Sequence, residues 1–564
     1  MWVLLPVVRA LARLAPGSGG PLLGAVLLRC LAPDWVLLRP RPPARQLAWA
    51  EEAVAVHRAY PRDPDRLSRA LAVHAQTLLA VGRYTEACAA ADASAAVPGA
   101  DPSPAETAHL LHVRAQALLE QGGAEEALEA ARSCVAAYRR GPAPAGRDRS
   151  LGSLPGALRT YALVLGELGH TEQSVLVYEE CAGLLRSMSF RESARFLLVL
   201  PRVLVELVGG LRTLGRYEEA LALGPEARES LGGGVAFAYP VIVPPLRIRL
   251  LVDLAGCRDA TGDRAGARDT AEEAVDAACA WTTRNQSQGI RWQGVTLSCL
   301  AGILGEMDAP DEELSTREQL VAVYMFLASE EPDPYDPLLG EAFDDLARCH
   351  RRAGDHTEAV VATRHGVEAY RRAVARDAAH EPELARALAN LSIRQDDAGD
   401  AESAVTSARE ALALTRRLAE SDWQTYHPLT ARRLHVLGQA LQATGDVTKT
   451  VSCYEEAEAV LEEHRDRPGA DADLARIRDV LSDALLARVV VDDLDAKVAD
   501  LRSLLDLADR ADTDYVHAKC FRAFNLARSD EVARAWQSAT GEPYPGSVYP
   551  FRTDRGRGSN PAAR

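Results

Sequence analysis

Lysine, aromatic residues and long apolar runs are scarce in this 564-residue chain. Aromatic residues make up 5% of it, and its three lysines are Lys449, Lys497 and Lys519. A phosphate-binding loop ends in glycine followed by lysine, whereas Lys449, the first lysine, follows Thr448. The G-x-S-x-G elbow of hydrolases and a dinucleotide-binding G-x-G-x-x-G are also missing. The sequence therefore favours a protein that is not an enzyme and needs no cofactor.

Paired cysteines and net positive charge are absent as well. None of the ten cysteines forms a C-x-x-C pair, so a cysteine zinc site or a thioredoxin-like site is not expected. Their scatter through apolar segments is typical of small buried side chains in a reducing cytoplasm. The formal charge of −16 argues against nucleic-acid binding, which needs a basic surface. Abundant Ala, Arg and Gly indicate a GC-rich genome, and we expect a bacterial, actinobacterial source.

The apolar N-terminus, "MWVLLPVVRALARLAPGSGGPLLGAVLLRCLAPDWVLL", is interrupted by Arg9, Arg13, Arg29 and Asp34. It therefore contains no run of about 20 apolar residues that could span a bilayer. We interpret residues 1–60 as an apolar helical cap or a degenerate repeat. A helix that contacts a membrane surface or a partner, and a misassigned start codon, remain alternatives.

A glycine recurs along the chain with a period near 46 residues. The spacings between successive copies are 40, 47, 46, 47, 92, 45 and 46 residues, and the recurring glycines are Gly82, Gly122, Gly169, Gly215, Gly262, Gly354, Gly399 and Gly445. The gap of 92 residues is two periods, with a worn copy expected near Gly305–Gln319. Such a period indicates supersecondary units stacked in one dimension.

Small residues recur at fixed distances from these glycines. Five residues after the glycine stand Ala87, Ala127, Ser174, Ala220, Ala267, Ala359, Ala404 and Thr450. Similar columns of small residues lie seven before and twelve after it, with Val208 as the main exception. We interpret each unit as two antiparallel helices joined at the glycine, with small side chains where helices cross closely. Stacked pairs form a superhelix with a concave wall.

This pattern of glycine and small residues resembles the tetratricopeptide repeat (TPR) family, in its longer form similar to the repeats of kinesin light chains and of many actinobacterial proteins. "HEPELARALANLS" and "YHPLTARRLHVLG" look like that form, with Pro382 and Pro428 at helix starts. The resemblance implies an all-α, right-handed superhelical solenoid of antiparallel helix pairs. Among the asparagines of that family's carboxylate clamp, only Asn390 is matched.

The predicted organisation has four parts. Residues 1–60 form the cap, 61–475 an array of about nine helix pairs, 476–541 degenerate repeats ending in a capping helix, and 542–564 a disordered tail rich in Pro, Gly and Arg. Loops between units are expected at 140–156, 232–245 and 330–337, where Pro and Gly cluster. The final helix is expected at Ser529–Gly541.

An arginine column is the candidate binding surface. Thirteen residues before the turn glycine, five of eight copies carry arginine, namely Arg69, Arg202, Arg249, Arg386 and Arg432. The family resemblance places this position on the concave wall, where aligned guanidinium groups could bind carboxylates of an acidic peptide. The alternative is a structural ladder, in which each arginine pairs with a carboxylate on the adjacent repeat.

No metal site is expected. His109 and His112 have a spacing compatible with a metal, but no third ligand is apparent, and we expect them to be solvated or to face the groove. Asp492, Asp493 and Asp495 are expected to cap a helix.

We therefore expect a cytoplasmic interaction scaffold that binds a protein or peptide in its groove. The alternatives are a sensor arm that binds a signalling peptide and controls a separate effector, and a helical-array enzyme.

Overall fold

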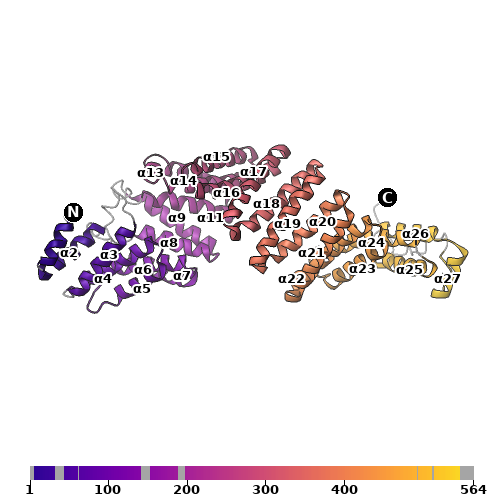
Figure 1. Ribbon diagram of the computed structural model, residues 1–564, viewed down its shortest axis with the longest axis horizontal. Coiled ribbons are helices and arrows are strands. Elements are labelled where there is room, and N and C mark those ends of the chain that lie inside the picture. Colours follow the sequence, from indigo (N-terminus) through magenta and orange to yellow (C-terminus); the bar gives the residue numbers. More distant parts are fainter. Residues whose placement is uncertain are drawn as a thin grey trace, which may run out of the picture. The chain divides into compact units, whose positions relative to one another are not determined.

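The computed structural model describes residues 5–14, 16–31, 43–60, 63–140, 153–188, 197–491, 493–510 and 514–545. Within these ranges every regular element is helical, which confirms the expected all-α fold. The chain divides into two compact units, residues 1–292 and 293–564. Figure 1 shows the helices of each unit packed side by side in sequence order.

The first unit begins with three helices and continues with antiparallel helix pairs. The three helices are α1 (Leu5–Leu14), α2 (Pro16–Leu31) and α3 (Pro43–Ala59). The paired helices are α4 (Pro64–Ala80) with α5 (Tyr84–Ala95), α6 (Pro104–Glu120) with α7 (Ala124–Arg140), α8 (Leu154–Glu167) with α9 (Thr171–Ser187), α11 (Val199–Thr213) with α12 (Tyr217–Ser230), and α14 (Val243–Ala260) with α15 (Arg264–Thr282). The short α13 (Gly233–Ala238) precedes α14.

The second unit continues the same pattern, and α16 (Gln286–Glu306) runs across the boundary between the units. Its further helices are α17 (Pro310–Glu330), α18 (Pro332–Ala353), α19 (His356–Arg376), α20 (Glu381–Asp397), α21 (Ala401–Ser421), α22 (Trp423–Ala443), α23 (Val447–Glu463), α24 (Ala470–Val491), α25 (Leu494–Arg510), α26 (Asp514–Leu526) and α27 (Asp530–Thr540). A 3-10 turn, η4 (Ala378–His380), precedes α20.

The turn glycines have the backbone conformation that the repeat requires. All eight have positive φ angles, between 72° at Gly215 and 86° at Gly354, a region in which a side chain costs free energy. After Gly399, the Asp400 amide donates to the Gln395 carbonyl at 2.8 Å, which closes a Schellman motif at the end of α20. The carboxylate of Asp400 then accepts from the Ser403 amide and caps α21. One Gly-Asp dipeptide therefore ends one helix and begins the next.

The worn copy turns at Asp308, not at Gly305. Asp308 has a φ of 55°, whereas Gly305 lies inside α16. The Ala309 amide donates to the Leu304 carbonyl, as in the glycine turns. Asp308 lies 46 residues after Gly262 and 46 before Gly354, so the period is kept. Aspartate tolerates the left-handed region better than most residues do.

The small-residue columns are buried, as predicted. Ala220, Ala267, Ala359 and Ala404 all have 0% exposure. Where a glycine stands in the column, a neighbour fills the space: a Cβ on Gly438 would lie 2.3 Å from the Tyr454 ring. Close helix crossings therefore depend on these positions.

One predicted loop and one predicted helix start are wrong, and a second predicted loop is confirmed only in part. Glu330 ends α17 and Pro332 begins α18, so 330–337 is almost entirely helical. Proline is tolerated in a first turn, whose amides have no helical acceptor. The segment 232–245 does connect two helix pairs, and residues 239–242 are not helical, but it also contains α13 and the start of α14. Pro382 does lie in the first turn of α20, but Pro428 lies inside α22, which begins earlier because Asp422 caps it.

The termini pack onto the repeats. Leu5, Leu23, Leu27 and Trp49 share a core with Leu71 of α4. At the other end, the expected final helix is α27, which Ser529 caps, and Trp536 is buried against Phe524. The predicted tail is described only to residue 545, and the loop predicted at 140–156 lies mostly outside the described residues. In the described chain, none of the helices combines the length and apolar character that a bilayer crossing needs.

Candidate functional site

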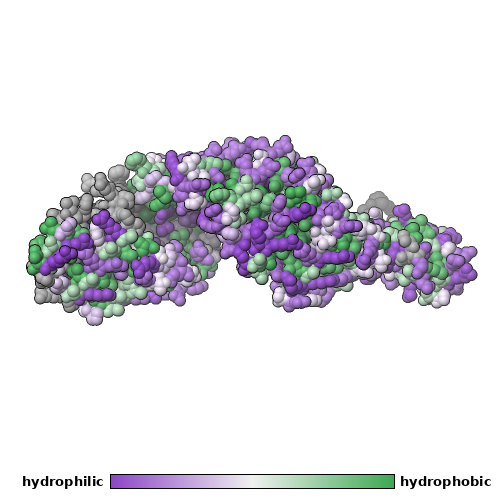
Figure 2. Space-filling model, in the orientation of Figure 1, coloured by the Kyte–Doolittle hydropathy of each residue, from purple (hydrophilic) through white to green (hydrophobic). Residues whose placement is uncertain are grey.

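The first helices of successive pairs form a continuous wall in the first unit and from α18 to α22 in the second. In the first unit α4 contacts α6, α6 contacts α8, α8 contacts α11, and α11 contacts α14. In the second unit the contacts join α18 to α20 and α20 to α22. Neighbouring pairs thus converge on the side of their first helices, the inner side of a curved array. Figure 2 shows hydrophilic and hydrophobic side chains mixed over α18–α21.

Three members of the arginine column pair with the neighbouring first helix. Arg69 of α4 bonds Glu106 of α6 at 2.8 Å. Arg249 of α14 bonds Glu206 of α11 at 2.9 Å. Each pair joins two consecutive repeats, as the ladder alternative expects. The arginine side chains nevertheless keep exposures of 41% and 44%, so they remain accessible from the wall.

Arg386 of α20 has the third such pair. Its Nη1 lies 3.0 Å from Oδ2 of Asp344 on α18, and the Asn390 amide donates to the same oxygen at 3.4 Å. Burial raises the pKa of Asp344, against the opposing effects of Arg386 and Asn390. Asp344 is 6% exposed. We infer that Arg386 and Asn390 provide the charge and the hydrogen bond that water would otherwise supply to this carboxylate.

Arg202 and Arg432 are different, because neither has an ion pair within the described chain. Burial lowers the pKa of Arg202 on α11, and the charge of Arg159 on α8 adds to the effect. Arg432 lies on α22 and lines two cavities. The five predicted arginines are therefore distributed over both units, and they do not form one cluster.

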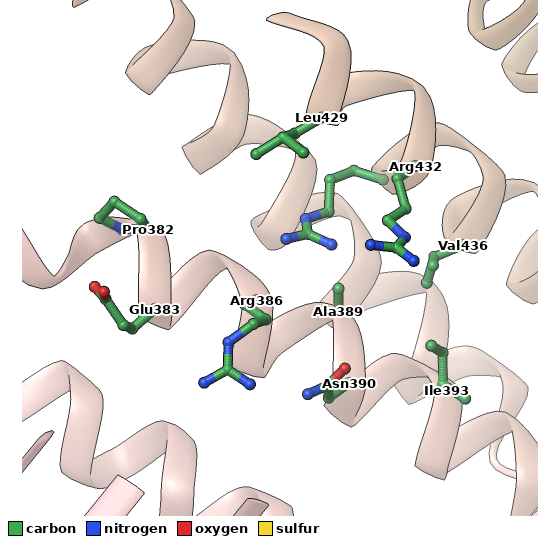
Figure 3. Close-up of a pocket in the computed structure, with 10 residues that line it drawn as sticks. Pro382, Glu383, Arg386, Ala389, Asn390, Ile393, Leu429, Arg432 and Val436 are labelled. Carbon is green, nitrogen blue, oxygen red and sulfur yellow. The ribbon is translucent and has the colours of Figure 1, made fainter. Parts of the chain in front are cut away.

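The cavity between α20 and α22 is the candidate site, because two members of the arginine column, Arg386 and Arg432, line it. It has a volume of about 550 Å³. We call it the α20–α22 groove; its lining residues are Pro382, Glu383, Arg386, Ala389, Asn390, Ile393, Leu429, Arg432, Arg433 and Val436. Figure 3 shows that Arg386 and Asn390 reach into it from one helix, while Leu429, Arg432 and Val436 face it from the other. It combines an apolar floor with guanidinium groups.

Arg433 is the functional candidate that the sequence pattern missed. It neighbours Arg432 and stands outside the column by one residue. Its Nε is buried and has no hydrogen-bond partner. Burial lowers the pKa of Arg433 to about 10, with further contributions from the charges of Arg432 and Arg386. A cation held this way is stabilised by any anion that enters the groove.

One acidic side chain faces the same groove. Glu383 lies on α20, and its Oε2 is buried without a hydrogen-bond partner. In Figure 3, Glu383 and Arg432 lie on opposite sides of the opening. The groove thus offers guanidinium groups from both helices and a single carboxylate, Glu383, on the α20 side, an arrangement that suits an extended chain carrying both charges.

A second cavity of about 400 Å³ adjoins the first between α22 and α24. It shares Leu429 and Arg432 with the α20–α22 groove and adds His464, Arg467 and Asp473. We call it the α22–α24 groove. Because two cavities share a wall, a ligand in extended conformation could contact three consecutive repeats.

The two histidines singled out by the sequence differ in burial: His109 is buried and His112 is partly exposed. His109 is 2% exposed, and His112 bonds Oγ1 of Thr160 at 2.9 Å. Desolvation lowers the pKa of His109 to about 4 and the pKa of His112 to about 3. The expectation that they are solvated or face a groove is therefore wrong for His109, whereas His112 is partly exposed and contacts α8, the next first helix of the wall. Asp493 caps α25 as expected, while Asp492 lies outside the described residues.

Comparisons with known proteins give only distant likenesses. No family model matches the chain, and no curated protein matches it. Among solved structures, BtubC (BKLC) from P. vanneervenii is 18% identical with a TM-score of 0.35, covering 44% of this chain and 93% of its own.

Two larger structures cover more of this chain. A STAND protein with a tetratricopeptide repeat sensor, PH0952 from Pyrococcus horikoshii, is 13% identical with a TM-score of 0.47, covering 78% of this chain and 64% of its own. The quorum sensor NprR from B. thuringiensis is 11% identical with a TM-score of 0.45, covering 69% and 97%. All three scores are below 0.5, so the assignment depends on the repeat itself. From its turn glycines, small-residue columns and helix pairing, the chain has the fold of a TPR-like helical array.

Proposed function

We propose that the chain is a non-enzymatic interaction scaffold that binds an acidic peptide, or an acidic extended segment of a partner protein, in the α20–α22 groove. The observation that carries the proposal is the pair Arg432 and Arg433, which lines the groove without an ion pair in the described chain. Nε of Arg433 is buried, and a buried guanidinium nitrogen is costly unless a partner meets it, whereas Arg432 is exposed and accessible to a ligand. A peptide carboxylate would supply that partner through charge-assisted hydrogen bonds.

The apolar lining supports a peptide over a small inorganic anion. Ala389, Ile393, Leu429 and Val436 provide surface for side chains of the ligand, and Asn390 offers an amide for its backbone. Arg69, Arg202, Arg249 and Arg386 are proposed as further contacts along the walls of the two units. A sensor arm would use the same groove for a signalling peptide and would add a separate effector protein.

The test compares defined peptides on the full chain. Fluorescence anisotropy with extended Glu- and Asp-containing peptides should give tighter binding than matched amide peptides, and affinity should fall as salt rises. Arg432→Ala and Arg433→Ala should each weaken binding by about 1.5–3 kcal/mol, roughly tenfold to a hundredfold. Arg409→Ala, at an exposed position of α21, is the control and should bind as the wild type does.

Two results would overturn the proposal. Acidic and neutral peptides that bind equally would remove the charge argument. Full affinity in a correctly folded Arg432→Ala/Arg433→Ala variant, checked by its melting temperature, would remove the groove.

A further inference from the structure

Two histidines and a glutamate meet at one end of the α22–α23 pair. His427 lies in the second turn of α22, Glu463 is the last residue of α23, and His464 follows it. Because the two helices are antiparallel, the start of α22 lies beside the end of α23. One ligand atom from each residue falls within 4.8 Å of the others. Nδ1 of His427 is 2.8 Å from Nε2 of His464.

The His427 ring is held in this direction by packing on its own helix. Trp423, one turn earlier, stacks on it with ring centroids 3.5 Å apart and planes 14° from parallel. Asp422 caps α22 just before Trp423 by accepting from the Thr425 amide. The cap therefore fixes the start of α22, and the Trp423 indole in turn fixes the orientation of the His427 ring. A pre-oriented ring loses little entropy when its nitrogen binds a ligand.

The charges around the cluster favour a cation. Glu463 has no ion pair in the described chain, so its carboxylate is free to balance an incoming positive charge. Glu456 is nearby but is paired with Arg416. The opposing charges are Arg432, Arg467 and Arg476, which line the α22–α24 groove with His464.

The donor set selects a class of metal. Two imidazole nitrogens and one carboxylate oxygen suit Zn²⁺ and related transition metals, whereas Ca²⁺ and Mg²⁺ prefer oxygen ligands alone. Three protein ligands leave at least one coordination position open. His464 also lines the α22–α24 groove, so a water or a ligand group from that groove could take the open position.

We propose that His427, Glu463 and His464 form a divalent transition-metal site, for Zn²⁺ in the first instance, that joins the start of α22 to the end of α23. The site differs from the arginine groove in its residues and in its ligand. A test of metal binding is therefore independent of a test of peptide binding in the α20–α22 groove.

Cobalt and zinc provide two independent readouts on the full chain. Co²⁺ added to the metal-free, reduced protein should give the visible d–d bands of a four- or five-coordinate site. Zn²⁺ should raise the melting temperature, because it binds the folded arrangement of ligands and not the unfolded chain. His464→Gln and Glu463→Gln keep the approximate shape of each side chain but remove a ligand or its charge. Each should weaken Zn²⁺ affinity at least about tenfold.

A surface histidine beside a carboxylate is the matched control. His365 is 3.6 Å from Glu368 on α19 and both are about half exposed, but no second histidine joins them in the described chain. His365→Gln should leave Co²⁺ bands and the Zn²⁺-dependent melting shift unchanged. His427→Gln provides a further variant that lacks one ligand. Its melting temperature in the presence of chelator shows whether the stack of His427 on Trp423 contributes to folding.

The outcomes separate cleanly. Loss of the bands and of the Zn²⁺-dependent shift in both His464→Gln and Glu463→Gln, with normal melting in chelator, supports the site. A wild-type protein with no d–d bands and no Zn²⁺-dependent shift overturns it and leaves a hydrogen-bonded histidine pair. Bands that persist in His464→Gln and vanish in His365→Gln would also overturn it.

Discussion

At the scale of single residues, the array tolerates exceptions to its small-residue rule when the exception has partners. The worn repeat places Glu313 five residues after Asp308, where the other copies carry a small residue. Glu313 is 3% exposed and bonds both Arg317 and Arg352. Desolvation pushes the pKa of Glu313 up, but hydrogen bonds from these arginines hold it below its ordinary value. The carboxylate is therefore kept ionised at a helix crossing.

The buried His109 makes the first unit sensitive to mild acid. An unfolded histidine takes up a proton near pH 6.5, whereas the folded pKa of His109 is about 4. The stability that neutral His109 contributes is fully present above pH 6.5 and is lost as the pH falls toward 4. Over the whole interval the loss is about 3 kcal/mol.

His109→Gln should abolish that part of the acid dependence. Between about pH 7 and about pH 5, the wild type should lose about 2 kcal/mol more than the variant, because only its unfolded state gains this proton. Thermal melts at the two pH values measure the difference, with the exposed His365→Gln as control. Parallel pH dependences of wild type and His109→Gln would contradict the assignment.

At the scale of helices, one element offers a direct test of the close-crossing argument. Ala404 and Ala413 lie on α21; Ala404 has 0% exposure and Ala413 is exposed. Ala404→Arg forces a long charged side chain into a packed crossing and should destabilise by at least about 3 kcal/mol. Ala413→Arg should change stability by less than about 0.5 kcal/mol. Denaturant melts of the two variants measure this, and equal midpoints would refute the packing role of the column.

The helix turns could be predicted from the sequence because their constraint is local. A left-handed residue and the alanines around it depend on positions within one repeat, so repetition makes them visible. The turn at Asp308 was not predicted, because a search for recurring glycines does not find an aspartate that adopts the same left-handed conformation. The prediction that Pro428 begins a helix was wrong, because the cap at Asp422 starts α22 several residues before this proline.

The site could be predicted only in part, because its partners lie outside the register of the repeat. The carboxylates that pair with the column arginines occupy different positions in their repeats. Glu206 lies 9 residues before the turn glycine of its repeat, Asp344 lies 10 before and Glu106 lies 16 before. An alignment of repeats therefore shows the arginines and hides their partners. His427 and His464 are 37 residues apart, and only antiparallel pairing of α22 and α23 brings them together.

At the scale of the whole molecule, the contacts are between near neighbours, and cooperativity should be local. Within each unit most helices contact those that precede and follow them, and several first helices also contact the next first helix. Stability in such arrays is a sum over repeats and their interfaces. Damage to one repeat should therefore open its neighbours and spare distant repeats.

Hydrogen exchange can test this directly. Ala220→Arg in α12, at a position with 0% exposure, should speed exchange in α11–α15 and leave α20–α23 at wild-type rates. Ala404→Arg should do the reverse. Uniform acceleration along the whole chain in either variant would show global cooperativity instead.

The Gly-Asp turns at Gly399 and Gly445 have a consequence for how such a gene can change length. The two glycines are 46 residues apart, and each is followed by aspartate. Recombination between the two copies would join Gly399 directly to Asp446 and recreate an intact turn, with every small-residue position of the next helix still in place. The same event would remove Arg432, Arg433 and His427 together. The number of repeats can thus change by whole periods while every remaining turn and helix crossing keeps its residues. Each such change adds or deletes all the binding residues of one repeat together.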